Sequence, residues 1–268
     1  MTMLHSFIER EGEIFTPTTM NGILIDGKRI ADQILQQTAK EVAELKQNGT
    51  TPSLAVILVG DDKPSHTYVR KKGEMAKSIG MDFTLHALPA QTTTNEITDL
   101  IEKIQTDPAL SGLIVQLPLP DHVDTNQVLQ RIHPGVDIDC LSNENLGKLV
   151  NKSEYIVPPT AGAVMSILED LKVDLIGKNV TIIGTGPLVG KPLAIMMMNA
   201  RASVTTCNSK TVNTREKCLA ADIIVTGVGK KDLLRGDMVS PGAIVIDTGV
   251  DFVDGVMYGD VNVLEVSE

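Results

Sequence analysis

Aromatic residues are scarce in this sequence of 268 residues, which contains no tryptophan and in which phenylalanine and tyrosine make up only 3%. Hydrophobic residues nevertheless account for 42% of the chain. The core must therefore be aliphatic, built from valine, isoleucine, leucine and methionine. A chain of this length and apolar content can bury a substantial core, and we expect it to form two domains.

Positive charge is also in short supply, since 24 lysines and arginines face 34 acidic residues for a formal net charge of −10. Nucleic-acid binding needs clustered cations, so we expect no nucleic-acid partner. The local exception is PSHTYVRKKGEMAKSIGM at residues 64–81, which contains Arg70, Lys71, Lys72 and Lys77. An anionic small molecule suits this basic stretch better than a polymer does.

Cysteine and histidine are few, and their spacing follows no ligand pattern. Cys140, Cys207 and Cys218 are neither paired nor spaced for a metal, which suits a reducing cytosol. The five histidines include no HExxH arrangement, so we expect no metal. No apolar run could span a bilayer, and the N-terminus lacks the apolar segment of a secretory signal. The sequence thus predicts a soluble cytoplasmic protein without a membrane partner, with a loosely ordered extension at residues 1–20.

Apolar runs alternate with amphipathic segments in the first half of the chain. The pattern predicts strands at 54–60, 82–89 and 111–120, and helices at 65–79 and 94–107. Thr94 and Asn95 are candidate caps for the second helix. Such a βαβαβ order implies a parallel sheet with right-handed crossovers.

The alternation restarts after Pro158 and Pro159, in the manner of a dinucleotide-binding half-sheet. The expected helices are 161–171, 191–200 and 214–221, and the expected strands are 178–186, 202–208, 221–229 and 242–250. The sequence therefore predicts an α/β protein with two domains. An N-terminal catalytic domain with a parallel sheet would cover residues 21–158, and a C-terminal Rossmann-like NAD(P)-binding domain residues 159–268.

A glycine-rich loop, IIGTGPLVGKP, follows one predicted strand and opens a helix, with glycines at 184, 186 and 190. The first two permit a tight turn and a close approach of the backbone to a pyrophosphate at the helix N-terminus. The spacing GxGxxxG is one residue longer than the common fingerprint, so an ordinary strand-to-helix turn remains an alternative. Its position at the first βα junction of the second series favours a dinucleotide site.

The strand after this loop bears on the choice of dinucleotide. NAD-selective sites usually end it with an acidic residue, which accepts hydrogen bonds from the ribose hydroxyls. Here VTTCNSKT offers Ser209, Lys210 and Thr211 and no carboxylate. A cation and hydroxyls suit the additional phosphate of NADP, so we expect NADP, with NAD less favoured. The alternative is that Lys210 is an ordinary surface lysine.

Six motifs follow one another in a fixed order: VGDDKPSHTYVRKK, GLIVQLPLP, HPGVDIDC, GTGPLVGKP, ADIIVTGVGK, and GAIVIDTGV with a later GDV. Through these motifs, residues 53–268 resemble the bifunctional methylenetetrahydrofolate dehydrogenase/cyclohydrolase family. The resemblance implies that 5,10-methylenetetrahydrofolate gives a hydride to the nicotinamide. Water then opens the resulting 5,10-methenyl cation to 10-formyltetrahydrofolate. The resemblance also implies a folate-binding first domain and a homodimer formed through the cofactor domain.

The resemblance places the catalytic lysine of the family at Lys72, its tyrosine at Tyr68, its glutamine at Gln116 and its pterin-binding aspartate at Asp139. A lysine amine can act first as base and then as acid where burial and cationic neighbours favour its neutral form. Tyr68 shares the helix face of Lys72. The residues expected to bind substrate are Tyr68, Gln116, Leu117, Pro118 and Asp139. Those expected to bind the cofactor are Gly184, Thr185, Gly186, Pro187, Val189, Gly190, Ser209, Lys210, Gly227, Val228, Gly229 and Val250.

Four features depart from the family pattern. Thr185 and Gly186 stand where the glycine loop usually has Arg-Ser, which removes a frequent contact to the cofactor phosphate. Cys140 replaces the glycine after the pterin-binding aspartate, with Leu141 in place of an aromatic residue, so we expect a different local backbone there. Ala161 replaces a proline near the domain boundary. The family continues beyond GDV into a closing loop and helix; if VNVLEVSE is the native end, the folate pocket would lack one wall.

Two alternatives compete with this interpretation. Short-chain dehydrogenases also use a YxxxK pair, but their pair follows the glycine-rich loop, whereas Tyr68 and Lys72 precede it. That alternative fails on the order of the motifs. The other alternative is a silent folate- or nucleotide-binding homologue, or one that keeps a single activity.

Overall fold

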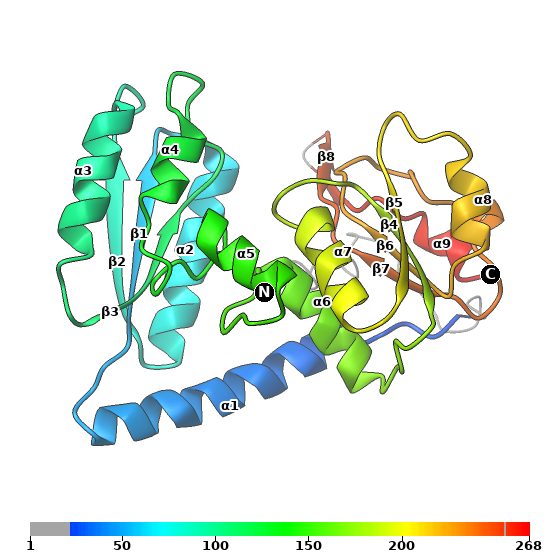
Figure 1. Cartoon of the computed structure of the whole chain (residues 1–268), viewed down its shortest axis with the longest axis horizontal. Coiled ribbons are helices and arrows are strands. Elements are labelled where there is room, and N and C mark those ends of the chain that lie inside the picture. The colour runs from blue at the N-terminus through cyan, green and yellow to red at the C-terminus, as the bar shows by residue number, and fades with distance from the viewer. Residues whose placement is uncertain (1–21, 255) are drawn as a thin grey trace. The chain divides into compact units, whose positions relative to one another are not determined.

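The structure, a computed structural model, describes residues 22–254 and 256–268. The chain divides into two compact units, each with a parallel sheet and helices (Figure 1). One unit, called here the catalytic unit, comprises Ala31–Val157. The other, called the dinucleotide unit, comprises Pro158–Glu268 and the described residues before Ala31. The N-terminal extension predicted at residues 1–20 lies outside the described residues.

The catalytic unit is built on a parallel sheet of three strands in the order β2-β1-β3. These strands are β1 (Ser53–Val59), β2 (Asp82–Leu88) and β3 (Leu110–Val115). The central strand β1 is apolar throughout because both of its faces are covered. Ala55, Ile57 and Val59 pack with residues of α3 (Thr94–Ile104) and α4 (Thr125–Gln130). Leu54, Val56 and Leu58 pack with residues of α2 (Lys63–Ser78).

The dinucleotide unit contains a parallel sheet of four strands in the order β5-β4-β6-β7. The strands are β4 (Asn179–Ile183), β5 (Ser203–Cys207), β6 (Ile223–Thr226) and β7 (Ile244–Asp247). The helices are α6 (Pro159–Asp170), α7 (Gly190–Asn199) and α8 (Thr214–Leu219). The strand order reverses at β4, which pairs with both β5 and β6. Ligands of open α/β sheets bind beyond the carboxyl ends of the strands at such a switch point.

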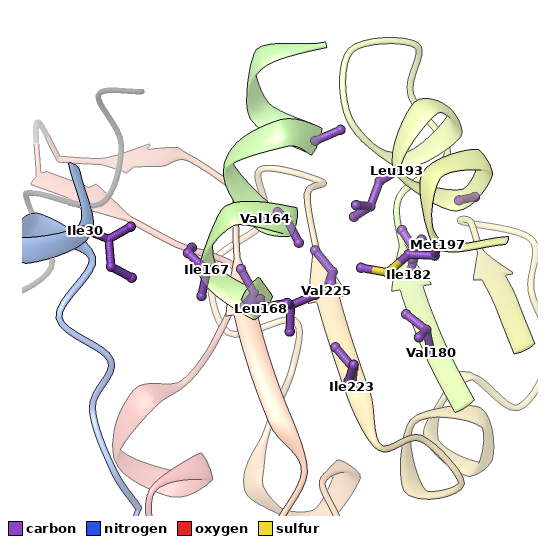
Figure 2. Packing of buried hydrophobic residues seen from close by; sticks show 13 residues of the cluster. Ile30, Val164, Ile167, Leu168, Val180, Ile182, Leu193, Met197, Ile223 and Val225 are labelled. Atoms are coloured by element: carbon purple, nitrogen blue, oxygen red, sulfur yellow. The ribbon is translucent and has the colours of Figure 1, made fainter. Parts of the chain in front are cut away.

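One face of this second sheet packs against α6 and α7 in the cluster drawn in Figure 2. Val180 and Ile182 of β4 and Ile223 and Val225 of β6 lie in it. The helices contribute Val164, Ile167, Leu168, Leu193 and Met197. Residues of the alternate register, such as Ile183 and Ile224, pack on the other face with Cys218 and Leu234. The cluster drawn in Figure 2 is aliphatic, as the composition predicts.

The element boundaries depart from the prediction in three ways. First, α3 is capped by Thr93 rather than by Thr94 or Asn95. The Thr93 hydroxyl accepts from the Glu96 amide at 3.3 Å, and the Glu96 carboxylate accepts from the Thr93 amide at 2.8 Å. This reciprocal pair is a capping box, and it explains why the helix starts at Thr94.

Second, the predicted strands are too long at their carboxyl ends. β3 ends at Val115 rather than at residue 120, because the prolines that follow lack the N–H that a sheet ladder needs. β4 ends at Ile183 and β6 at Thr226, each directly before a glycine.

Third, several elements have no counterpart in the prediction. They are α1 (Gly27–Gln47), α5 (Asn143–Val150), the hairpin of β8 (Asp251–Val253) and β9 (Val256–Tyr258), α9 (Val263–Val266), α4 and a 3₁₀ turn at Gly236–Met238. Ile30 and Val42 are the only buried hydrophobic side chains of α1, so its apolar pattern is sparse. Within the described part of the chain, no helix has the length and apolar character needed to cross a bilayer.

Candidate active site

Lys72 lies in the middle of α2, and its amine Nζ is 3.2 Å from Oε1 of Gln116. Gln116 follows β3 directly, and its backbone N–H donates to the Ile57 carbonyl of β1 at 2.9 Å. Its side-chain Nε2 donates to the carbonyl of Leu117 at 2.7 Å. Because the amide nitrogen is engaged, the amide oxygen faces the lysine. The structure therefore brings together two residues that lie 44 positions apart in the chain.

Gly73, next to Lys72, fixes how closely α2 approaches the sheet. A Cβ atom at this position would lie 2.7 Å from the ring of Phe83 in β2. A larger residue would push the helix outward and carry Lys72 with it. No pattern in the sequence predicts this constraint, although the motif YVRKKG contains the glycine.

Tyr68 lies one turn before Lys72 and is half-buried, and burial raises the pKa of its phenol. Its hydroxyl has no hydrogen-bond partner among the described residues. Arg70 pairs with Glu74 on the exposed side of α2, with 2.6 Å between Nη1 and Oε1. Lys71 is also exposed. These two cations are thus exposed, whereas Lys72 is half-buried.

The two aspartates of the HPGVDIDC motif have different surroundings. Asp137 is 1% exposed, and it accepts hydrogen bonds from the amides of Leu141 at 3.1 Å and Ser142 at 2.8 Å. It also accepts from Nδ2 of Asn145 at 3.1 Å. Asp137 therefore holds the turn that leads into α5. The role of Asn145 was not predicted, because it depends on contacts that form only in the folded loop.

Asp139, in contrast, accepts no hydrogen bond from any residue that the structure describes. Burial raises the pKa of its carboxyl, the charge of Lys72 acts in the opposite direction, and Asp137 raises it further. A half-buried carboxylate that no described residue supplies with a donor is suited to N–H donors of a ligand. Lys72 thus interacts with Gln116 through a hydrogen bond and with Asp139 through its charge.

Cys140 replaces a glycine of the family pattern, and it adopts the left-handed conformation that favours glycine, with φ of 56°. A non-glycine residue pays about 1–2 kcal/mol in this region. The thiol is fully buried, and it donates to the Ile156 carbonyl at 3.7 Å. Burial raises its pKa to about 11. The backbone at Cys140 therefore takes a turn that a glycine would take without strain.

The other substrate candidates directly follow Gln116. Leu117 is half-buried, Pro118 is exposed, and the peptide between them is cis. Among the described residues, no group of three or more His, Cys, Asp or Glu side chains could hold a metal ion.

In the dinucleotide unit, the three glycines of the loop after β4 have distinct surroundings. Gly184 has φ of 111°, and a Cβ there would lie 2.6 Å from the Gly227 carbonyl. A Cβ at Gly190 would overlap the Gly184 carbonyl, so close packing of α7 requires a glycine. A Cβ at Gly186 would meet no atom within 4 Å. Gly186 is therefore not needed for packing, which leaves its backbone open to a ligand such as a pyrophosphate.

The remaining cofactor candidates lie at the same edge of the sheet, because the parallel strands end in register. Ile183 of β4 pairs with Cys207 of β5 and with Thr226 of β6. Ser209 and Lys210 follow β5 and are exposed. Gly227, Val228 and Gly229 follow β6, and Val250 follows β7. Of the sequence-predicted cofactor residues, Thr185 and Val189 are half-buried and Pro187 is exposed in the glycine loop.

Together, a glycine loop at a switch point and a lysine–glutamine pair beside an unpaired aspartate define a two-domain α/β enzyme with an NAD(P)-binding domain. Residues 25–139 match the catalytic domain of tetrahydrofolate dehydrogenase/cyclohydrolase, and residues 158–268 match its NAD(P)-binding domain. The chain belongs to this family. It is a bifunctional methylenetetrahydrofolate dehydrogenase and methenyltetrahydrofolate cyclohydrolase of one-carbon metabolism.

Several relatives support this assignment. The chain is 41% identical over 243 residues to the bifunctional protein FolD of Bacillus subtilis, covering 90% of this chain and 86% of the relative. It resembles the crystal structure of the FolD enzyme from Campylobacter jejuni with a TM-score of 0.90 and 37% identity, covering 91% and 88% of the two chains. The Trypanosoma brucei FolD structure, complexed with NADP cofactor and an inhibitor, gives a TM-score of 0.88 at 34% identity over 92% and 88%. These matches favour two activities over the silent and single-activity alternatives.

Proposed function

We propose that this enzyme oxidises 5,10-methylenetetrahydrofolate with NADP⁺ and hydrolyses the methenyl product, with Lys72 as its proton-transfer group. The contact between Lys72 Nζ and Gln116 Oε1 at 3.2 Å carries the proposal. It holds an amine at a defined position beside Asp139, and the charge of this amine lowers the pKa of the Asp139 carboxyl. An amine placed in this way can move protons at a substrate bound by the carboxylate.

The residues of the catalytic unit divide the work with folate. Asp139 accepts hydrogen bonds from adjacent pterin N–H groups and so fixes the ring. Tyr68 lies against the substrate on the face of α2 that carries Lys72, and Leu117 and Pro118 line the same site next to Gln116. Gln116 keeps the lysine amine directed at the one-carbon unit.

Proton transfer is the task of Lys72 in the hydrolytic half of the reaction. The methenyl carbon is an electrophilic cation shared between N5 and N10, so water adds to it readily. Lys72 accepts a proton as the water oxygen bonds to this carbon, and it returns a proton to N5 as the C–N5 bond breaks. As the C–OH group of the water adduct becomes the formyl C=O, its hydroxyl proton leaves to solvent. The formyl group then remains on N10, N5 keeps the proton returned by Lys72, and the reaction releases one proton net.

NADP supplies the hydride acceptor when bound, and the residues at the carboxyl edge of the second sheet fit it. Gly186 leaves room for the pyrophosphate, and α7 starts at Gly190 without a side-chain cap that would occupy its N–H groups. Ser209 and Lys210 are exposed after β5, where an NAD-selective site would carry an acid. A relative from Trypanosoma brucei was crystallised with NADP. These observations support NADP over NAD.

Replacement of Lys72 tests the proton-transfer role. Lys72→Ala should lower the cyclohydrolase rate by about 10²- to 10⁴-fold, the usual contribution of a general acid–base group. The rate of reduced-cofactor formation should fall less, because hydride transfer itself moves no proton to or from the lysine. Decay of methenyltetrahydrofolate and formation of the reduced cofactor, followed separately, give the two rates. Lys71→Ala, the exposed neighbour, should leave both within about twofold. A cyclohydrolase rate unchanged in Lys72→Ala would refute the assignment.

The pH dependence of folate binding tests Asp139. Burial raises the pKa of its carboxyl, and only the ionised form accepts two pterin N–H groups. Affinity should therefore be full at higher pH and be lost as pH falls through a pKa above the ordinary value of about 4. Calorimetric titration with a stable folate analogue from pH 5 to pH 8 would measure this loss. Asp139→Asn should bind about tenfold more weakly with a flatter profile, whereas Asp99→Asn on exposed α3 should keep the wild-type profile. Identical profiles for wild type and Asp139→Asn would contradict the role.

Charge reversal at Lys210 tests the choice of cofactor. Lys210→Glu should lower kcat/KM for NADP⁺ by about tenfold, because a carboxylate repels the additional phosphate at short range. The value for NAD⁺, which lacks that phosphate, should change much less. The matched control is Lys172→Glu, in the exposed turn before β4 at the opposite end of the strands. If Lys210→Glu lowers kcat/KM equally for NADP⁺ and NAD⁺, Lys210 does not bind the additional phosphate.

We also propose a homodimer formed through the dinucleotide unit. β5 is an edge strand of its sheet, and the chain after it exposes Val212 by 73%. An open edge strand and an exposed apolar side chain are features that a subunit interface would cover. Light scattering after size exclusion should give about twice the monomer mass of 28.8 kDa. A monomer at micromolar concentration would rule the dimer out.

A further inference from the structure

Asp260, from the GDV motif, is completely buried in the dinucleotide unit, yet it carries no direct role in the chemistry. Its two carboxylate oxygens accept one backbone hydrogen bond each. Oδ2 accepts from the Val228 amide at 2.7 Å, and Oδ1 accepts from the Lys230 amide at 2.7 Å. The carboxylate therefore fixes the segment Gly227–Lys230, which directly follows β6, through these two hydrogen bonds.

Two glycines allow the backbone to approach Asp260 closely enough for these two hydrogen bonds. Gly229 lies between the two donors and has φ of 76°, and a Cβ there would lie 2.8 Å from the Val250 carbonyl. Gly249 packs directly on the carboxyl group of Asp260, which a Cβ at this position would overlap. The segment thus follows a path that larger residues would block at both points.

A second carboxylate braces the same region from β7. Asp247 accepts from the Thr226 hydroxyl at 3.0 Å and from the amides of Gly249 and Val261, each at 2.9 Å. It joins the end of β6 to the segments after β7 and next to Asp260. Asp247 therefore fixes the backbone at the end of β6 and next to Asp260 as well.

The hydrogen bond from the Val228 amide to Asp260 also sets the direction of the Gly227 carbonyl. In a planar trans peptide the carbonyl lies opposite the N–H, so a Val228 N–H aimed at Asp260 turns the Gly227 oxygen away from it. That oxygen faces the glycine loop, 2.6 Å from the position of a Cβ on Gly184. No donor among the described residues reaches it. Val228, whose side chain is 50% exposed, lies on the same segment.

We propose that Asp260 is a positioning residue of the dehydrogenase reaction. Its carboxylate holds Gly227–Lys230 so that the Gly227 carbonyl stands beside the glycine loop as a fixed acceptor for an amide N–H of the bound dinucleotide. Only a carboxylate offers an acceptor to both amides, since an asparagine would turn an NH₂ group toward one of them. The inference rests on the proposed dinucleotide site and adds a residue that does not touch the cofactor.

The test compares Asp260→Asn with the matched variant Asp222→Asn. Asp222 also accepts a backbone N–H in this unit, from Asn179 at 2.8 Å, but at the start of β4 and so at the opposite end of the strands. Gly249→Ala displaces the same carboxyl group without removing it, because a Cβ at this position would overlap it, and this variant serves if Asp260→Asn does not fold. The readouts are the dissociation constant for NADP⁺, the dehydrogenase kcat and KM, thermal unfolding, and the cyclohydrolase rate measured without nucleotide.

Asp260→Asn and Gly249→Ala should each weaken NADP⁺ binding by about tenfold or more, which corresponds to about 1.4 kcal/mol. The cyclohydrolase rate should stay within about twofold in both, and Asp222→Asn should match the wild type. Unchanged NADP⁺ binding in the folded variants would overturn the inference, as would an equal loss of both activities. A failure of the proposed function is distinguishable, because the wild-type enzyme itself would then show no NADP⁺ binding or turnover.

Discussion

The hydrogen bond between Lys72 and Gln116 is the contact on which the catalytic unit depends. It joins α2 to the end of β3, two elements whose relative position is set by the apolar packing of β1 on both faces. Gln116 is oriented by the Leu117 carbonyl, and α2 is held close to β2 by Gly73. An amine on a flexible side chain thereby acquires a defined position, which is what proton transfer at a bound substrate requires.

Buried aspartates perform a comparable task in each unit. Asp137 accepts the amides that shape the loop next to Asp139, and Asp260 accepts the amides that shape the loop after β6. A carboxylate that receives several backbone N–H groups fixes a loop more firmly than a neutral side chain could. Both loops are irregular, so neither can be fixed by a helix or a sheet ladder. In this enzyme, charged residues without a chemical role shape the segments that contain the candidate site residues.

The sequence predicts much of the fold, and the reason lies in local patterns. The run LAVILV is apolar because β1 is covered on both faces, so it predicts a buried strand. Glycines stand at 184 and 190 because the backbone there lies too close to other atoms for a side chain. The long helix α1 was not predicted because only two of its hydrophobic side chains are buried. The roles of Asn145 and Asp260 were not predicted either, since their partners lie in loops whose shape no periodicity encodes. Tertiary contacts between irregular segments could not be predicted from the sequence.

The left-handed turn at Cys140 has a consequence for the chemical durability of the enzyme. A thiol one residue from the pterin-binding candidate would ordinarily invite alkylation or oxidation, since the thiolate is the reactive species. Here the same turn that presents Asp139 directs the sulfur inward, where burial raises its pKa to about 11. Near neutral pH the sulfur keeps its proton and has no access to solvent. The substitution of cysteine for glycine thus adds a latent nucleophile without exposing it to electrophiles in the cell.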